Sequence, residues 1–218
     1  MTKDTQQLQG ATGLQEVFVD RPAAVSAVAV VLHPHPLLGG NANHKVPFSI
    51  MRALTGAGVC VYRPNFRGVG ESAGVFDAGE LETRDILCLI KHVRAVEGPL
   101  PLLLVGFSFG AYVAAKTAVA LNTAGTTYDD LVLCGLPSGE ARDQRHYDTP
   151  DVSGACLIHA ERDEHAPLHN TLRWAANNKT PVTVVADADH FFSGKLDIFS
   201  ALIRDRALRA CAPPRSCD

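Results

Sequence analysis

The chain has 218 residues, of which 46% are hydrophobic and 20% are charged, so a disordered polymer is excluded and there is room for one sizeable α/β domain. The 20 Lys and Arg residues against 23 Asp and Glu residues give a net charge of −3 without any basic block, which excludes a surface for nucleic acid or anionic membranes. The longest apolar run, residues 23–32, is far shorter than the roughly 20 residues of a membrane span. The polar N-terminus carries no visible signal peptide, so we expect a cytoplasmic protein.

The chain is expected to form one domain over residues 14–209, between a polar N-terminal segment (1–13) and a tail with Pro and Cys (210–218). The first β-rich run, Leu14–Val19, alternates apolar and polar residues and is predicted to be an edge strand. The later runs are short, apolar and rich in Val, Leu and Ile, which is typical of strands buried on both faces of a parallel sheet. These predicted strands are Ala27–Leu32, Val59–Arg63, Leu102–Val105, Leu131–Cys134, Ala155–His159 and Val182–Ala186.

Segments with helical periodicity lie between these runs. In the second of them, Ile86, Leu89, Ile90 and Val93 form one apolar stripe suited to a sheet face. Alternating strands and helices predict βαβ units in a mostly parallel, doubly wound sheet, where chemistry collects at the carboxyl ends of the strands. The predicted helices are Val46–Gly56, Gly79–Val96, Phe109–Leu121, Leu168–Asn177 and Lys195–Leu208.

The strongest functional motif is Gly106-Phe107-Ser108-Phe109-Gly110, between the predicted strand 102–105 and the helix that begins near Phe109. This strand–turn–helix context is the one that a nucleophile elbow requires, because the sharp turn exposes the serine hydroxyl. The helix N-terminus also places unpaired N–H groups beside the serine. We therefore expect Ser108 to be a nucleophile rather than only a helix cap.

A serine hydroxyl needs a base and an acid that orients the base. The loop after strand 155–159 contains Asp163, and the loop after strand 182–186 contains His190, so the chain order nucleophile, acid, histidine is that of α/β-hydrolases. We expect His190 as base and Asp163 as acid. The open alternatives are His165 and His169 for the base, and Glu161, Glu164 and Asp189 for the acid.

Two N–H groups are needed to bind the oxyanion of a tetrahedral intermediate. One is expected from Phe109, the residue after the nucleophile. The other is expected from the loop His33-Pro34-His35-Pro36-Leu37, in which the prolines have no N–H, so His35 and Leu37 remain and Leu37 is preferred.

Three histidines near this loop, His33, His35 and His44, could suggest a zinc site. No CxxC or HExxH spacing accompanies them, so we expect no metal and no cofactor. Four cysteines, at 60, 88, 134 and 156, lie in apolar stretches where a free thiol packs as a small core residue. Whether Cys211 and Cys217 pair in the tail is left open.

The segments HPHPLLGG, RPNFRGVGES, GFSFG, HAERDEHAPL and DADHFF together resemble the small, cap-less bacterial α/β-hydrolases related to dienelactone hydrolases and serine esterases. The resemblance extends from about Leu14 to about Leu208. It implies an α/β-hydrolase fold with Ser108, Asp163 and His190 as the triad, and a mainly structural turn at residues 65–72. His165 departs from the pattern, since a β-branched residue is more usual before this proline.

The segment between Gly135 and Gly154 is too short for a folded cap, so an open site is expected, with Phe107, Phe191 and Phe192 as substrate-binding residues. Core packing is the open alternative for Phe107 and Phe192. These features favour a serine hydrolase for an ester or thioester of a small acyl group. The alternatives are an acyltransferase or peptidase with the same triad, and a non-enzymatic binding scaffold. The oligomeric state is not predicted.

Overall fold

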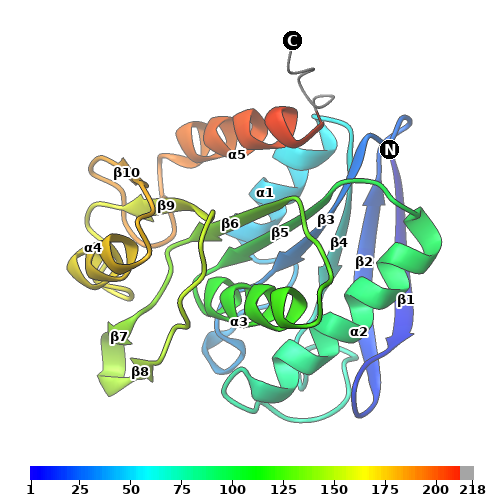
Figure 1. Cartoon of the computed structure of the whole chain (residues 1–218), viewed down its shortest axis with the longest axis horizontal. Helices are drawn as coiled ribbons and strands as arrows, with labels where there is room; N and C mark the ends of the chain where they lie inside the picture. The colour runs from blue at the N-terminus through cyan, green and yellow to red at the C-terminus, as the bar shows by residue number, and fades with distance from the viewer. Residues whose placement is uncertain (212–218) are drawn as a thin grey trace.

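An eight-stranded sheet runs through the protein in the order β1-β2-β4-β3-β5-β6-β9-β10 (Figure 1). The computed structural model describes residues 1–211. Strand β2 is antiparallel to both β1 and β4, and all other neighbouring strands are parallel, which confirms the predicted fold class. The strands of this sheet are β1 (Thr2–Gln9), β2 (Leu14–Arg21), β3 (Ala27–Leu32), β4 (Val59–Pro64), β5 (Leu102–Phe107), β6 (Asp130–Cys134), β9 (Cys156–Ala160) and β10 (Val182–Val185).

Helices cover both faces of the sheet (Figure 1). Helices α1 and α5 pack on one face, and α2, α3 and α4 pack on the other. All five expected helices are present, with ends shifted by at most three residues. Within residues 1–211, no helix has both the length and the apolar character needed to span a membrane. The helices are α1 (Lys45–Thr55), α2 (Glu80–Glu97), α3 (Phe109–Thr123), α4 (Leu168–Asn177) and α5 (Leu196–Cys211), with short 3₁₀ turns η1 (Pro36–Leu38) and η2 (Arg142–Gln144).

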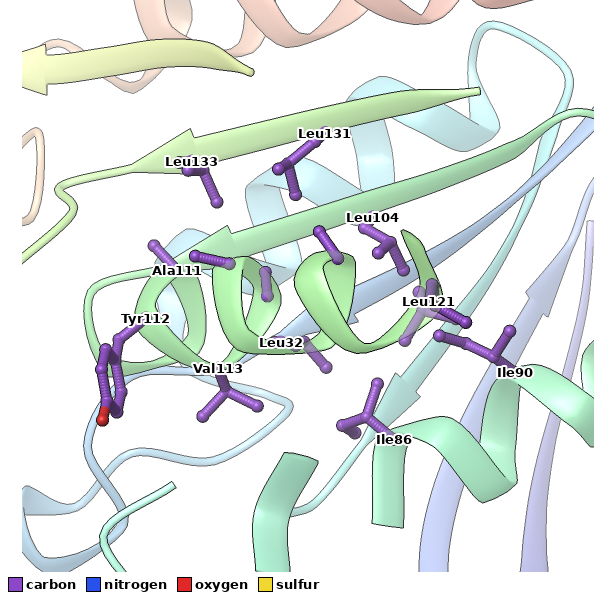
Figure 2. Close-up of a cluster of buried hydrophobic side chains, with 14 of the residues drawn as sticks. Leu32, Ile86, Ile90, Leu104, Ala111, Tyr112, Val113, Leu121, Leu131 and Leu133 are labelled. Atoms are coloured by element: carbon purple, nitrogen blue, oxygen red, sulfur yellow. The ribbon is translucent and has the colours of Figure 1, made fainter. Parts of the chain in front are cut away.

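The central strands are apolar on both sides because each side faces a helical layer. In β3, Val28, Val30 and Leu32 belong to the core beneath α2 and α3, whereas the alternate residues belong to the core beneath α1 and α5. Figure 2 shows the first of these cores, where Leu104 of β5 points toward α3 and Ile86 of α2 packs from the other side. This double burial fixes the register of β5, whose carboxyl end leads into Ser108.

The N-terminal segment differs from the prediction. Residues 2–9 form β1, which occupies the edge of the sheet, so the expectation that Leu14–Val19 is the edge strand was wrong. The sequence of β1 is polar and its side chains are mostly exposed, so it has no apolar alternation to reveal it. It is held by backbone pairing to β2 along its whole length.

The turn after β4 is a network of buried polar groups. Arg63 donates to Asp20 at 2.8 Å, and Arg67 donates to Asp85 at 3.0 Å, with all four side chains at most 7% exposed. The Asn65 side chain accepts the N–H of Ala42 at 2.8 Å, which ties this turn to the segment that leads into α1. These bonds pair the buried charges of opposite sign and link β2, β4 and α2 on the antiparallel side of the sheet.

Leu104 has no exposed surface and lies between the sheet and α3. Replacing Leu104 by Ala should lower the free energy of unfolding by about 2–5 kcal/mol, because apolar contacts are lost and a cavity is left. Leu172→Ala is the matched control: Leu172 is 45% exposed on α4, and its loss should cost less than about 0.5 kcal/mol. Urea denaturation of both variants measures the difference; equal costs would contradict this account of the core.

Candidate active site

Ser108 occupies a strained turn between β5 and α3. Its φ of 56° and ψ of −123° lie outside the regions that residues other than glycine usually adopt. The turn is held by hydrogen bonds from the Ser108 N–H to the Cys134 oxygen, at 2.8 Å, and from the Ala111 N–H to the Ser108 oxygen, at 2.8 Å. The strain projects the hydroxyl out of the turn at the N-terminus of α3.

The two glycines of the motif permit this turn because backbones pass very close to them. A Cβ on Gly106 would lie 2.2 Å from the Gly110 oxygen, and a Cβ on Gly110 would lie 2.3 Å from the Leu32 oxygen. Both contacts are with backbone atoms, which cannot move aside as a flexible side chain can. Glycine at both positions is therefore a requirement of packing.

His190 and Asp163 come from loops at the carboxyl ends of the neighbouring parallel strands β10 and β9. The Oγ of Ser108 lies 2.9 Å from Nε2 of His190, and Nδ1 of His190 lies 2.7 Å from Oδ2 of Asp163. The structure therefore brings the three expected residues into one hydrogen-bonded chain. His190 is 3% exposed and Asp163 is 6% exposed, so the chain is largely shielded from water.

The surroundings of Asp163 keep it ionised. Burial alone raises the pKa of this carboxyl, but the hydrogen bond to His190, the electrostatic interaction with the same ring and the Ala166 N–H outweigh burial and hold the pKa below its usual value. Its Oδ1 accepts the N–H groups of His165, at 2.9 Å, and Ala166, at 2.7 Å. Both oxygens are thus fixed, and Oδ2 remains directed at His190.

His159 was not expected near the site and lies behind Asp163, fully buried. Its Nε2 is 2.9 Å from the Ala166 oxygen and 3.5 Å from Oδ2 of Asp163. Burial lowers the pKa of His159, so the ring is neutral at pH 7. The apolar neighbours of this residue in the sequence concealed its role, since it forms part of a predicted core strand.

The alternative acids and bases are engaged elsewhere. Glu161 accepts the Asp187 N–H at 2.8 Å, and Asp189 accepts the N–H groups of Phe191 and Ser193 within its own loop. The ring of His165 stacks on that of His190, with centroids 4.7 Å apart, but its Nε2 faces Nη1 of Arg142 at 3.4 Å. His169 lies on α4 and Glu164 is exposed on the loop surface.

The loop after β3 supplies one wall of the cleft above Ser108. His35 lines this cleft, whereas Leu37 lies outside its lining and its side chain is 69% exposed. Phe109, the other expected donor, follows Ser108 directly, and its N–H belongs to the first turn of α3, where no intrahelical acceptor exists. This placement favours His35 over the preferred Leu37 as the second backbone donor.

His33 fixes the start of this loop. Its Nε2 accepts the Phe66 N–H at 2.9 Å, and its Nδ1 lies 2.7 Å from the Pro34 oxygen, so Nδ1 carries the proton. Burial lowers the pKa of His33 to about 3, because the charged form of the ring loses its hydration. The loop is thereby attached to the turn that follows β4.

Two of the three phenylalanines expected to bind substrate do not line the cleft. Phe192 is fully buried and stacks on Phe199 of α5, with ring centroids 4.3 Å apart. Phe107 is also fully buried, and its ring packs against His190 at 5.0 Å. Their assignment to substrate binding was therefore wrong, and the open alternative of core packing holds for both; Phe107 also contacts the imidazole of His190. Phe191 lines the cleft as expected.

The segment between β6 and β9 builds another wall of the cleft above Ser108. It forms a small hairpin of β7 (Gly139–Glu140) and β8 (His146–Tyr147) around η2. Its side chains Arg142, Arg145 and Tyr147 line a cleft of about 320 Å³ that also contains Ser108. The prediction that no cap domain is inserted here agrees with this geometry, but the basic wall was missed, because the segment has no periodic pattern that would reveal a hairpin.

Metal ligands are not gathered in this site. Over residues 1–211, no group of three or more His, Cys, Asp or Glu side chains is arranged to hold a metal ion. The open question of whether Cys211 pairs with Cys217 involves a residue, Cys217, outside the described range.

Comparison with known proteins assigns the chain to a family. The model of the alpha/beta hydrolase family matches residues 29–150, more than half of the chain. The chain belongs to this family. A relative in sequence, the uncharacterized protein RP471 of Rickettsia prowazekii, is 31% identical over 194 residues, which cover 82% of this chain and 77% of the relative.

Solved structures support the same assignment. A serine hydrolase without a lid from Xanthomonas campestris, XC6422, has a TM-score of 0.84 and 32% identity, covering 98% of this chain and 96% of its own. An alpha-beta serine hydrolase homologue from Coxiella burnetii has a TM-score of 0.81 and 30% identity, covering 94% of this chain and 98% of its own. The predicted resemblance to cap-less α/β-hydrolases is confirmed, and hydrolase activity in general is supported.

The neutral state of His33 makes this α/β hydrolase sensitive to acid. Because the folded pKa of about 3 lies below the ordinary value of 6.5, the unfolded chain binds a proton that the folded chain does not. The stability due to this group is complete above pH 6.5 and is lost as the pH falls toward 3. Between about pH 5.5 and pH 4, the slope from His33 alone approaches about 1.4 kcal/mol per pH unit.

His33→Gln keeps an oxygen that can accept the Phe66 N–H but removes the titration. Urea denaturation between pH 6 and pH 4.5 should show a shallower pH slope for the variant than for the wild type. Parallel slopes would mean that His33 does not titrate between the folded and unfolded states as described.

Proposed function

We propose that this protein is a serine hydrolase that cleaves a carboxylic ester or thioester of a small acyl group through an acyl-enzyme intermediate. The observation that carries the proposal is the hydrogen-bonded chain from Ser108 through His190 to Asp163, which begins at a strained turn and opens into a cleft. Nucleophile, base and orienting acid are thus within reach of one another before substrate binds.

In the acylation step, Oγ of Ser108 attacks the carbonyl carbon while Nε2 of His190 takes the hydroxyl proton. The N–H groups of Phe109 and His35 stabilise the oxyanion. The tetrahedral intermediate collapses, the bond to the alcohol or thiol breaks, and His190 gives the proton to the leaving group. Water then attacks the acyl-serine, His190 accepts its proton and returns it to Oγ, and the free acid leaves. Asp163 holds the required tautomer and stabilises the imidazolium throughout.

The shape of the cleft supports a small acyl group. Its volume of about 320 Å³ must hold both the acyl group and part of the leaving group. Among the described residues that line it, Phe191 is the one phenylalanine, so few large apolar side chains surround the substrate. A methylene contributes about 0.8 kcal/mol only where apolar surface encloses it, so long chains gain little here.

Ser108→Ala should leave the fold intact and lower ester hydrolysis by about 10⁴-fold or more, because the members of such a triad act as a unit. The measurement is kcat/KM for 4-nitrophenyl butyrate, together with labelling of the folded protein by a fluorophosphonate. Wild type should be labelled at Ser108 and the variant should not. Folded wild type that neither reacts with the probe nor hydrolyses esters would favour a binding scaffold instead.

Asp163→Asn should lower kcat by about 10⁴-fold while preserving the shape of the site, because an amide cannot hold His190 in the required tautomer. Glu161→Gln is the matched control, since this neighbouring carboxylate bonds the Asp187 N–H and not His190. The control should stay within about threefold of wild type in steady-state kinetics. The reverse ranking of the two variants would remove Asp163 as the acid.

A further inference from the structure

The cleft has one strongly charged wall that the proposed chemistry does not use. Arg142 and Arg145 both line it, from the η2 turn and the residue that follows it. Among the described residues that line the cleft, Asp143 is the only acidic one. The wall therefore carries a net positive charge in the same cleft that His35 lines.

The arginines are held in place by the backbone of the hairpin. Arg142 donates its N–H to the His165 oxygen at 3.0 Å, which attaches the wall to the loop of Asp163. Nε of Arg145 donates to the Arg142 oxygen at 3.0 Å, so this guanidinium is oriented by the turn itself. A cation fixed in this way loses less side-chain entropy when it binds a ligand.

The guanidinium groups retain free hydrogen-bonding capacity. Asp143 contacts Arg145 at 3.4 Å and Arg142 at 3.8 Å, both longer than a close charge-assisted bond, and its side chain is 64% exposed. Each guanidinium has five N–H donors, most of which are not used by these contacts. The exposed carboxylate of Asp143 is thus only weakly paired with the two guanidinium groups, and a carboxylate of a ligand would be attracted to the same place.

The charge of Arg145 acts on two histidines that line the cleft. Its charge adds to burial in lowering the pKa of His35, to about 4, and it also contributes to the lowered pKa of His165. These histidines follow β3 and β9, which lie on opposite sides of β5 in the sheet. Arg145 and Ser108 line the same cleft, so the positive charge of the guanidinium acts within the space that holds the substrate.

We propose that the wall formed by Arg142 and Arg145 selects esters or thioesters that carry a carboxylate a few bonds from the scissile carbonyl. This inference rests on the proposed function, because it names the substrate class of the same site. The carboxylate would accept two N–H groups of Arg145 in the planar, two-pronged geometry that a guanidinium offers, with Arg142 adding charge. Asp143 would compete weakly for the same donors.

The test compares mono-4-nitrophenyl glutarate with 4-nitrophenyl pentanoate, which differ only in a terminal carboxylate in place of a methyl group. A second pair, 4-carboxyphenyl butyrate and 4-carbamoylphenyl butyrate, places the charge on the leaving group instead. Wild type should favour the anionic member of at least one pair by about tenfold or more in kcat/KM. The pair that shows the preference identifies which side of the ester faces the wall. The preference should weaken as salt is added.

Substitutions in the wall should change the ratio of kcat/KM for the anionic ester to that for its neutral partner, some lowering it and one raising it. Arg145→Gln and the double variant with Arg142→Gln should reduce the preference toward unity. Asp143→Asn removes the competing carboxylate and should increase it; Asn tolerates the φ of 61° found at this position. Arg209→Gln is the control, because Arg209 is exposed on α5 and pairs with Asp205. It should leave the ratio unchanged.

The inference and the proposed function fail in different ways. Hydrolysis of both neutral esters that depends on Ser108, without preference for either anionic ester, would overturn the inference and leave the hydrolase intact. A preference that survives in the double variant would also overturn it. Absence of hydrolysis of all four esters by folded wild type would overturn both.

Discussion

The close passage of α3 against β3 and β5 is the constraint on which the site depends. The backbone of α3 lies against β5 at Gly106 and against β3 at Gly110. The chain must therefore turn sharply at Ser108, which adopts a positive φ. The cost of such strain, of order 1–3 kcal/mol, is offset by the core that holds β5 and α3 in place. The register of the buried strands thus determines where the hydroxyl points, and the loops of β9 and β10 need only deliver their side chains to that point.

Electrostatics adds a second layer of organisation around the serine. A buried carboxylate, Asp163, remains ionised because it is surrounded by donors, whereas the nearby histidines 33, 35 and 159 are kept neutral by burial. This separation leaves a fixed negative charge behind the imidazole of His190 and few competing positive charges beside it. The positive charge of the cleft is instead placed on the far wall, on arginines that remain protonated at any working pH.

The sequence was sufficient to predict the central sheet, all five helices and the three residues that the structure joins at Ser108. These depend on strong local signals: uninterrupted apolar strands, a helical stripe in α2, and glycines flanking a serine between strand and helix. It could not reveal β1, because that strand is held by backbone pairing rather than by an apolar face. It also could not distinguish Phe191 from Phe192, because adjacent phenylalanines look alike in sequence; in the structure Phe192 has a positive φ and a fully buried ring, whereas Phe191 lines the cleft.

The hairpin that bears Arg142 and Arg145 has two strands of only two residues each and lies outside the main sheet. Little of the hydrophobic core depends on it, so substitutions and changes of length there cost the fold little stability. The nucleophile, by contrast, is fixed by backbone contacts that tolerate almost no change. The sequence of this segment, about ten residues long, can therefore change during evolution while the turn at Ser108 stays the same. Substrate preference can then change without any change in the catalytic residues.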